Sequence, residues 1–66
     1  MDFSIGDEVV IISAGSIYTR EDRIGQVGFI IEINDKTATI SSGQNRIHAA
    51  LSDLEHTSNS YHLHVD

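Results

Sequence analysis

Alternating apolar and polar positions recur along the chain and predict short β-strands. The clearest run covers residues 25–34, and its apolar positions at every second residue are Val27, Phe29, Ile31 and Ile33. A two-residue period is typical of a strand with one face in the core, so we expect these four side chains to point inward. Gly28, in the middle of the run, indicates a bulge or a sharp bend.

Other segments complete an all-β pattern. The predicted strands cover residues 8–12, 25–34, 37–41, 46–49 and 60–65. A tight turn at residues 34–36 joins the second strand to the third, because Asn and Asp tolerate left-handed backbone. Leu51 and Leu54 are three residues apart, so one helical turn before the last strand would place both on the core. The long polar loop at residues 13–23 has a length that is usually functional or mobile.

The length of 66 residues predicts a single domain over residues 1–66, with its core between about residues 4 and 56. The absence of cysteine excludes disulfides and Cys-type zinc sites, so a small apolar core must stabilise the fold, and a homodimer would extend it. The N-terminus lacks the basic and apolar pattern of a secretory signal, and the longest apolar run is too short to span a membrane. The expected location is therefore the cytoplasm.

Charge narrows the classes of partner. Ten carboxylates and four basic side chains give a formal net charge of −6. The basic residues, spread along the chain, are Arg20, Arg23, Lys36 and Arg46. Because nucleic-acid binders usually show clustered Lys and Arg, we expect no strong direct binding to DNA or RNA. The acidic charge can steer the protein toward a basic protein partner, or it can simply keep a small protein soluble.

The order of the predicted strands is that of an SH3-like barrel, and three stretches resemble the KOW-type and related bacterial SH3-like domains. The stretches are Ile5-Gly6-Asp7-Glu8-Val9-Val10-Ile11, Gly25-Gln26-Val27-Gly28-Phe29-Ile30 and Leu51-Ser52-Asp53-Leu54-Glu55. The resemblance implies an all-β, five-stranded SH3-like barrel with one short helical turn before the last strand. It also implies contact with RNA, for which family members carry basic residues in loops and strands. This chain departs from that pattern, with Glu21, Asp22, Glu32 and Asp35 in the corresponding stretches.

The side chains that could carry chemistry are few. His62 and His64 share one face of the predicted last strand and could reach one metal ion, with His56 or Asp66 completing the site. The simpler interpretation is that they fill the solvent face of that strand, and we expect no metal. The paired carboxylates lie where solvation is expected, and no nucleophile elbow or phosphate-cradling glycine loop is present. We therefore expect no catalytic residues, no cofactor and no enzymatic activity.

The loop after the first strand is a better candidate for binding. Tyr18, with Arg20 and Arg23 beside it, could anchor a partner, since an exposed Tyr offers a large amphipathic surface. Equally, Tyr18 could fold back over one end of the barrel. In SH3-like barrels this loop borders the binding surface, so the resemblance supports the first alternative.

The leading hypothesis is an acidic, non-enzymatic protein-binding module, a small regulator or inhibitor of the bacterial or phage type. In its sharpest form it is a DNA mimic, whose carboxylates occupy the nucleic-acid-binding surface of a basic protein. The candidate carboxylates are Asp7, Glu8, Glu21, Asp22, Glu32, Asp35, Asp53 and Glu55. One alternative is a KOW-like accessory module that contacts RNA or the ribosome. Another is a structural subunit of a larger complex, in which Val10, Ile12 and Ile30 form an exposed apolar patch.

Overall fold

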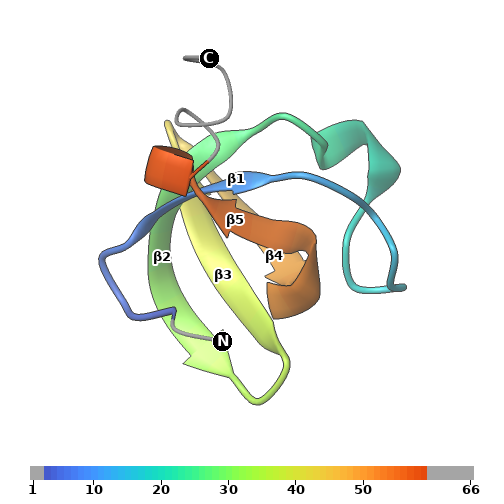
Figure 1. Ribbon diagram of the computed structural model, residues 1–66, viewed down its shortest axis with the longest axis horizontal. Helices are drawn as coiled ribbons and strands as arrows, with labels where there is room; N and C mark the ends of the chain where they lie inside the picture. The colour runs from blue at the N-terminus through green and yellow to red at the C-terminus, as the bar shows by residue number, and fades with distance from the viewer. Residues whose placement is uncertain (1–2, 60–66) are drawn as a thin grey trace.

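The computed structural model describes residues 3–59, which form five β-strands and two short 3-10 helices. The strands are β1 (Glu8–Ile11), β2 (Val27–Asn34), β3 (Thr37–Ser42), β4 (Asn45–Ala50) and β5 (Leu54–His56). The 3-10 helices are η1 (Glu21–Arg23), between β1 and β2, and η2 (Leu51–Asp53), between β4 and β5 (Figure 1). No helix in this part of the chain is long and apolar enough to cross a membrane.

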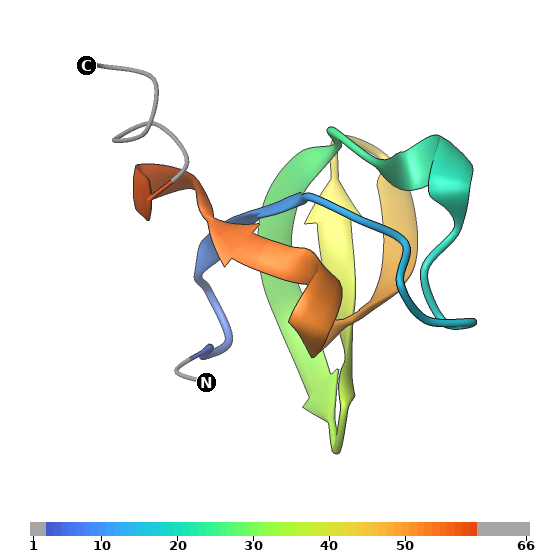
Figure 2. The ribbon, with the colours of Figure 1, turned by 45° about the vertical axis from the view of Figure 1, so that its right-hand side comes forward.

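The strands form one antiparallel sheet in the order β4-β3-β2-β1-β5. Short turns join β2 to β3 and β3 to β4, whereas β5 pairs with β1, at the other side of the sheet (Figure 2). Through η2 the chain passes from β4, at one edge of the sheet, to β5, at the other edge. These two edge strands do not pair with each other. Within residues 3–59 the sheet is therefore not closed by hydrogen bonds into the barrel that the sequence predicted.

All five strands contribute side chains to one core. Its buried members are Val9, Ile11, Ile30, Ala38, Ile40, Ile47, Ala49 and Leu54. Full burial of an aliphatic side chain of this size contributes about 1.5–3 kcal/mol, so these residues supply most of the driving force for the curled sheet. Phe3, Ile33 and Leu51 pack against the core from its margins, which confirms the inward position predicted for Leu51 and Leu54.

The alternation predicted for β2 is present, but its phase is the opposite of the predicted one. Val27, Phe29 and Ile31 are exposed, whereas Gly28 and Ile30 face the core. The expectation that the first three point inward is therefore wrong.

Close approach of β3 explains the phase. A Cβ atom on Gly28 would overlap the carbonyl oxygen of Ser41 and would lie 2.6 Å from Ile40 Cγ2, so only glycine fits at this crossing. A β-bulge between Ile30 and Glu32 then shifts the register of β2 against β3. Beyond the bulge, Ile33 is half-buried against the core, as predicted.

The last strand differs most from its prediction. The fifth strand is the three-residue β5, which directly follows η2. The helical turn predicted near residues 51–55 is confirmed but ends at Asp53. The strand predicted at residues 60–65 lies outside the described residues.

Candidate functional site

The face of β1 and β2 that points away from the core carries exposed apolar side chains. Val27, Phe29 and Ile31 are 45%, 51% and 39% exposed. Val10 of β1 lies directly opposite Val27 in the antiparallel register, and opposed residues share a face of the sheet. These four residues are called the outer patch below.

Carboxylates border the outer patch. Glu8 lies opposite Phe29, and Glu55 of β5 lies opposite Val10. Glu32 follows Ile31 at the bulge and is exposed. The outer face of β1, β2 and β5 therefore combines apolar surface with negative charge.

The apolar patch proposed from the sequence is only partly present. Ile30 is fully buried, and Val10 is half-buried. Ile12 is 46% exposed, just beyond the end of β1. The exposed apolar residues of β2 are instead those that the sequence pattern assigned to the core.

The eight candidate carboxylates do not form one surface. Glu21 and Asp22 lie on η1, whereas Asp35 lies in the turn between β2 and β3, at the far end of the molecule from η1 (Figures 1 and 2). Asp53, expected on the surface, is only 2% exposed. Its carboxylate points into the fold, where it accepts hydrogen bonds from the loop that follows β1. A partner therefore cannot reach it.

Asp53 fastens the long loop to the sheet. Its Oδ1 atom accepts hydrogen bonds from the hydroxyl of Ser13 at 2.6 Å and from the N–H of Gly15 at 3.0 Å. Burial alone would raise the pKa of Asp53, but these bonds, with contributions from the Thr19 hydroxyl and the Ser16 N–H, hold the pKa below its usual value. Among these bonds, that from Ser13 lowers the pKa most. Oδ2 has no hydrogen bond of good geometry to the described residues.

A second carboxylate joins the start of β1 to the end of β5. Asp7 Oδ2 lies 2.9 Å from His56 Nε2 and accepts a hydrogen bond from the N–H of Ser4 at 2.9 Å. The hydrogen bond with His56 is the main cause that lowers the pKa of Asp7, and the Ser4 N–H adds to it. The ring of Phe3 stacks on His56 with centroids 4.6 Å apart. The pair ties the start of the described chain to β5.

Tyr18 is exposed rather than folded over one end of the sheet. Arg20 pairs with Asp22 on the surface, with its Nη2 atom 2.7 Å from Asp22 Oδ2. A hollow of about 200 Å³ is lined by all three anchor residues predicted from the sequence, Tyr18, Arg20 and Arg23. Arg46 and His48 of β4 line the same hollow, and no spacing along the chain indicated that they would.

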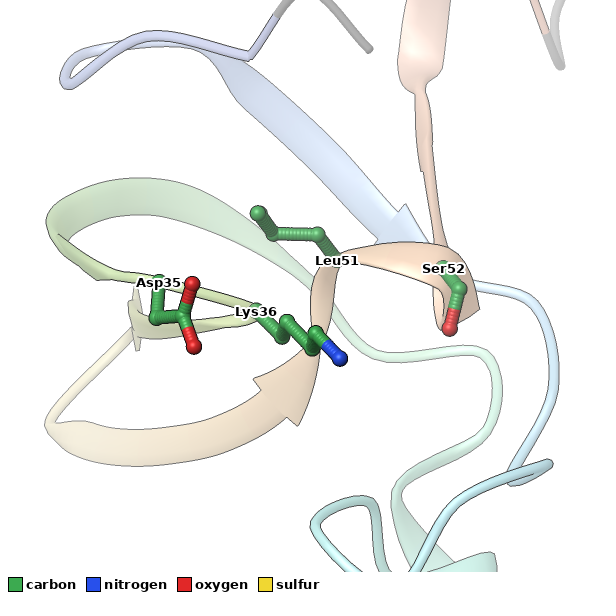
Figure 3. Close-up of a pocket in the computed structure, with 4 residues that line it drawn as sticks. All are labelled: Asp35, Lys36, Leu51 and Ser52. Atoms are coloured by element: carbon green, nitrogen blue, oxygen red, sulfur yellow. The ribbon is translucent and has the colours of Figure 1, made fainter.

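A second hollow, of about 250 Å³, lies between the β2–β3 turn and η2 (Figure 3). Asp35, Lys36, Leu51 and Ser52 line it. The Leu51 N–H donates a hydrogen bond to the Lys36 carbonyl at 2.9 Å, which joins the turn to η2. The side chains around it are thus one carboxylate, one ammonium, one hydroxyl and one aliphatic group.

Among residues 3–59, no group of three or more His, Cys, Asp or Glu side chains could hold a metal ion. His56 is bound to Asp7, and His48 lies 3.3 Å from the Thr39 hydroxyl through Nδ1. His62, His64 and Asp66, the other members of the metal site considered from the sequence, lie outside the described residues.

Comparison with known proteins gives no relative: no family model, no curated protein and no solved structure matches this chain. The resemblance to KOW-type domains therefore remains at the level of strand order and turn residues.

Proposed function

We propose that this chain is a non-enzymatic binding module for a basic protein partner, which it contacts through the outer patch. The observation that carries the proposal is the apolar surface of Val27, Phe29 and Ile31. Single exposed apolar residues are normal on proteins, but neighbouring ones on a single strand favour an interface.

Charge favours a basic partner over a neutral one. Glu8 and Glu55 lie directly opposite members of the outer patch, and the whole chain carries a net charge of −6. A cationic surface would be steered toward such a face, and its charges would meet carboxylates at the rim of an apolar contact.

DNA mimicry is the finer form of this proposal. It requires three carboxylates, the exposed Glu8 and Glu32 and the half-buried Glu55, to occupy positions that DNA phosphates take on the partner. Competition by DNA for the same partner distinguishes mimicry from simple charge attraction.

Membership of the SH3-like class is also part of the proposal. Three features support it: the sheet of five short antiparallel strands, its strong curl, and the 3-10 turn that leads into the last strand. This class often serves as an interaction module, so it agrees with binding but does not identify the partner.

The test is capture of partners from bacterial lysate by the tagged chain and two variants. Phe29→Ala removes the largest side chain of the outer patch, and we expect it to lose the captured protein. Ile17→Ala is the matched control, since Ile17 is 94% exposed but lies in the loop, away from β2. Equal capture by the wild type and Phe29→Ala would contradict the proposal.

Salt and nucleic acid separate the alternatives. A basic partner should be lost at high salt, because screening weakens charge-driven pairing, and DNA should displace it if mimicry holds. A partner insensitive to both would indicate a structural subunit. Submicromolar RNA affinity of the purified chain would favour the KOW-like alternative. Dimerisation abolished by Phe29→Ala would show that a second copy covers the outer patch.

A further inference from the structure

Three of the four basic side chains of this acidic protein line one hollow. The hollow, of about 200 Å³, lies between the long loop with η1 and the outer side of β4. Its lining residues are Tyr18, Arg20, Arg23, Arg46, Ile47 and His48. None of the carboxylates in residues 3–59 is among them. The hollow is thus locally basic on a chain with a net charge of −6.

Two of the three guanidinium groups have no ion-pair partner among residues 3–59. Arg20 is bound to Asp22, and both side chains are largely exposed. Within residues 3–59, Arg23 and Arg46 make no side-chain hydrogen bond and have no carboxylate within ion-pair distance. Arg23 is also half-buried. A half-buried guanidinium without an acceptor gives up water contacts that an anion could replace.

The walls of the hollow are held in place by hydrogen bonds. Thr19 is buried, and its hydroxyl accepts a hydrogen bond from the Ala50 N–H at 2.9 Å, which joins the loop to the end of β4. The N–H of Tyr18 donates to the Ser16 hydroxyl at 3.1 Å. The first bond holds the loop against β4 and the second lies within the loop, so a ligand would find this segment already ordered.

His48 and Tyr18 offer the hollow a further polar atom and an aromatic face. His48 contacts Thr39 through Nδ1, which leaves Nε2 without a hydrogen bond to the described residues. The Tyr18 ring is 56% exposed at the rim and offers a face for stacking.

We propose that this hollow binds a small phosphomonoester whose phosphate meets Arg23 and Arg46 and whose ring stacks on Tyr18, as a nucleoside monophosphate would. The planar fork of donors on Arg matches phosphate oxygens better than a point charge does. A hollow of about 200 Å³ suits a phosphate whose attached ring lies on the exposed Tyr18, and the net charge of −6 repels a long polyanion. This site is separate from the outer patch and does not depend on the proposed function.

The experiment is an NMR titration of the full chain with adenosine monophosphate, ribose 5-phosphate, inorganic phosphate and adenosine. We expect saturable shifts of Tyr18, Arg23 and Arg46 signals with the nucleotide. The order of affinity should be nucleotide, then ribose 5-phosphate and inorganic phosphate, then adenosine. Comparison of inorganic phosphate with the nucleotide separates simple anion binding from recognition of the attached ring.

Variants assign the contacts. Arg46→Ala, at an exposed position, should weaken nucleotide binding about tenfold or more, because a charge-assisted hydrogen bond is lost. Arg23→Lys keeps the charge but loses the fork, and should also weaken binding. Tyr18→Ala should weaken binding of the nucleotide while leaving ribose 5-phosphate unchanged. Lys36→Ala, at the distant β2–β3 turn, is the control and should bind as the wild type does.

Three results would overturn the proposal. They are the absence of saturable shifts at millimolar nucleotide, equal binding by Arg46→Ala and the wild type, and tighter binding of a single-stranded oligonucleotide than of the nucleotide. The last result would make nucleic acid the ligand. A thermal unfolding scan of each variant shows whether a loss of binding comes from a loss of fold.

Discussion

At the scale of single residues, the orientation of β2 decides which side chains stabilise the fold. Ile30 is fully buried, whereas Phe29 is 51% exposed. We therefore expect Ile30→Ala to lower the free energy of unfolding by about 2–5 kcal/mol, and Phe29→Ala by about 1 kcal/mol or less. Urea unfolding followed by circular dichroism measures both. A larger loss for Phe29→Ala than for Ile30→Ala would restore the orientation predicted from the sequence.

The same strand shows what an apolar pattern can and cannot predict. The two-residue period predicted a strand correctly, because four apolar residues alternate with others from Val27 to Ile33. Its phase was wrong because Gly28 counts as non-apolar, although it lies at the closest crossing with β3. The bulge then reverses the phase before Ile33. Gly28 did indicate a special backbone position, but the sequence does not show that β3 crosses there or that the bulge lies between Ile30 and Glu32, because both depend on the neighbouring strand.

At the scale of elements, Asp53 of η2 holds the loop that carries Tyr18. Asp53→Asn keeps an acceptor for Ser13 and Gly15 but loses the charge that strengthens both bonds. We expect a loss of about 1–3 kcal/mol in the free energy of unfolding and faster hydrogen exchange at the Gly15 N–H. Asp22→Asn, at an exposed site, is the control and should change stability by about 0.5 kcal/mol or less. Unchanged exchange at Gly15 in Asp53→Asn would show that the loop is held by other contacts.

The elements themselves were largely predictable from the sequence, except the last. A β-branched apolar run for β1, and alternation with turn residues for the next strands, placed β1 to β4 within two residues of their observed bounds. By contrast, β5 has only three residues and directly follows a helical turn, so its own sequence shows no strand pattern. Pairing with β1 is what makes this segment a strand. The role of Asp53 was missed for a related reason: its partners Ser13 and Gly15 lie about 40 residues away in the chain.

At the scale of the whole molecule, net charge and local charge differ. The count of four basic residues and ten acidic ones correctly describes an acidic chain. Pairing of β3 with β4 nevertheless brings Arg46 to the hollow that Arg20 and Arg23 line. The inference that the cations are dispersed holds along the sequence but not in space. A compact fold can thus present a basic hollow and an acidic outer face on the same small surface.

The response of stability to pH tests how these charges support the fold. The pKa values of Asp7 and Asp53 are lowered from their ordinary value of 3.8, so both carboxylates bind protons more readily in the unfolded chain. Their contribution is therefore complete above about pH 3.8 and is lost as the pH falls through the folded-state values. Between pH 7 and the isoelectric point near 4.9, by contrast, falling net charge relieves repulsion.

Together these effects predict maximal stability near pH 5 and a steep fall below about pH 4. Urea unfolding midpoints from pH 2.5 to 7 measure the profile for the wild type and for Asp53→Asn. The Asn variant cannot lose the Asp53 contribution on protonation, so the two profiles should converge toward acid. Glu32→Gln, at an exposed site, is the control for loss of one charge. Its unfolding midpoints should change with pH in the same way as those of the wild type at acid pH. A constant difference between the wild type and Asp53→Asn across the range would mean that the charge of Asp53 does not stabilise the fold.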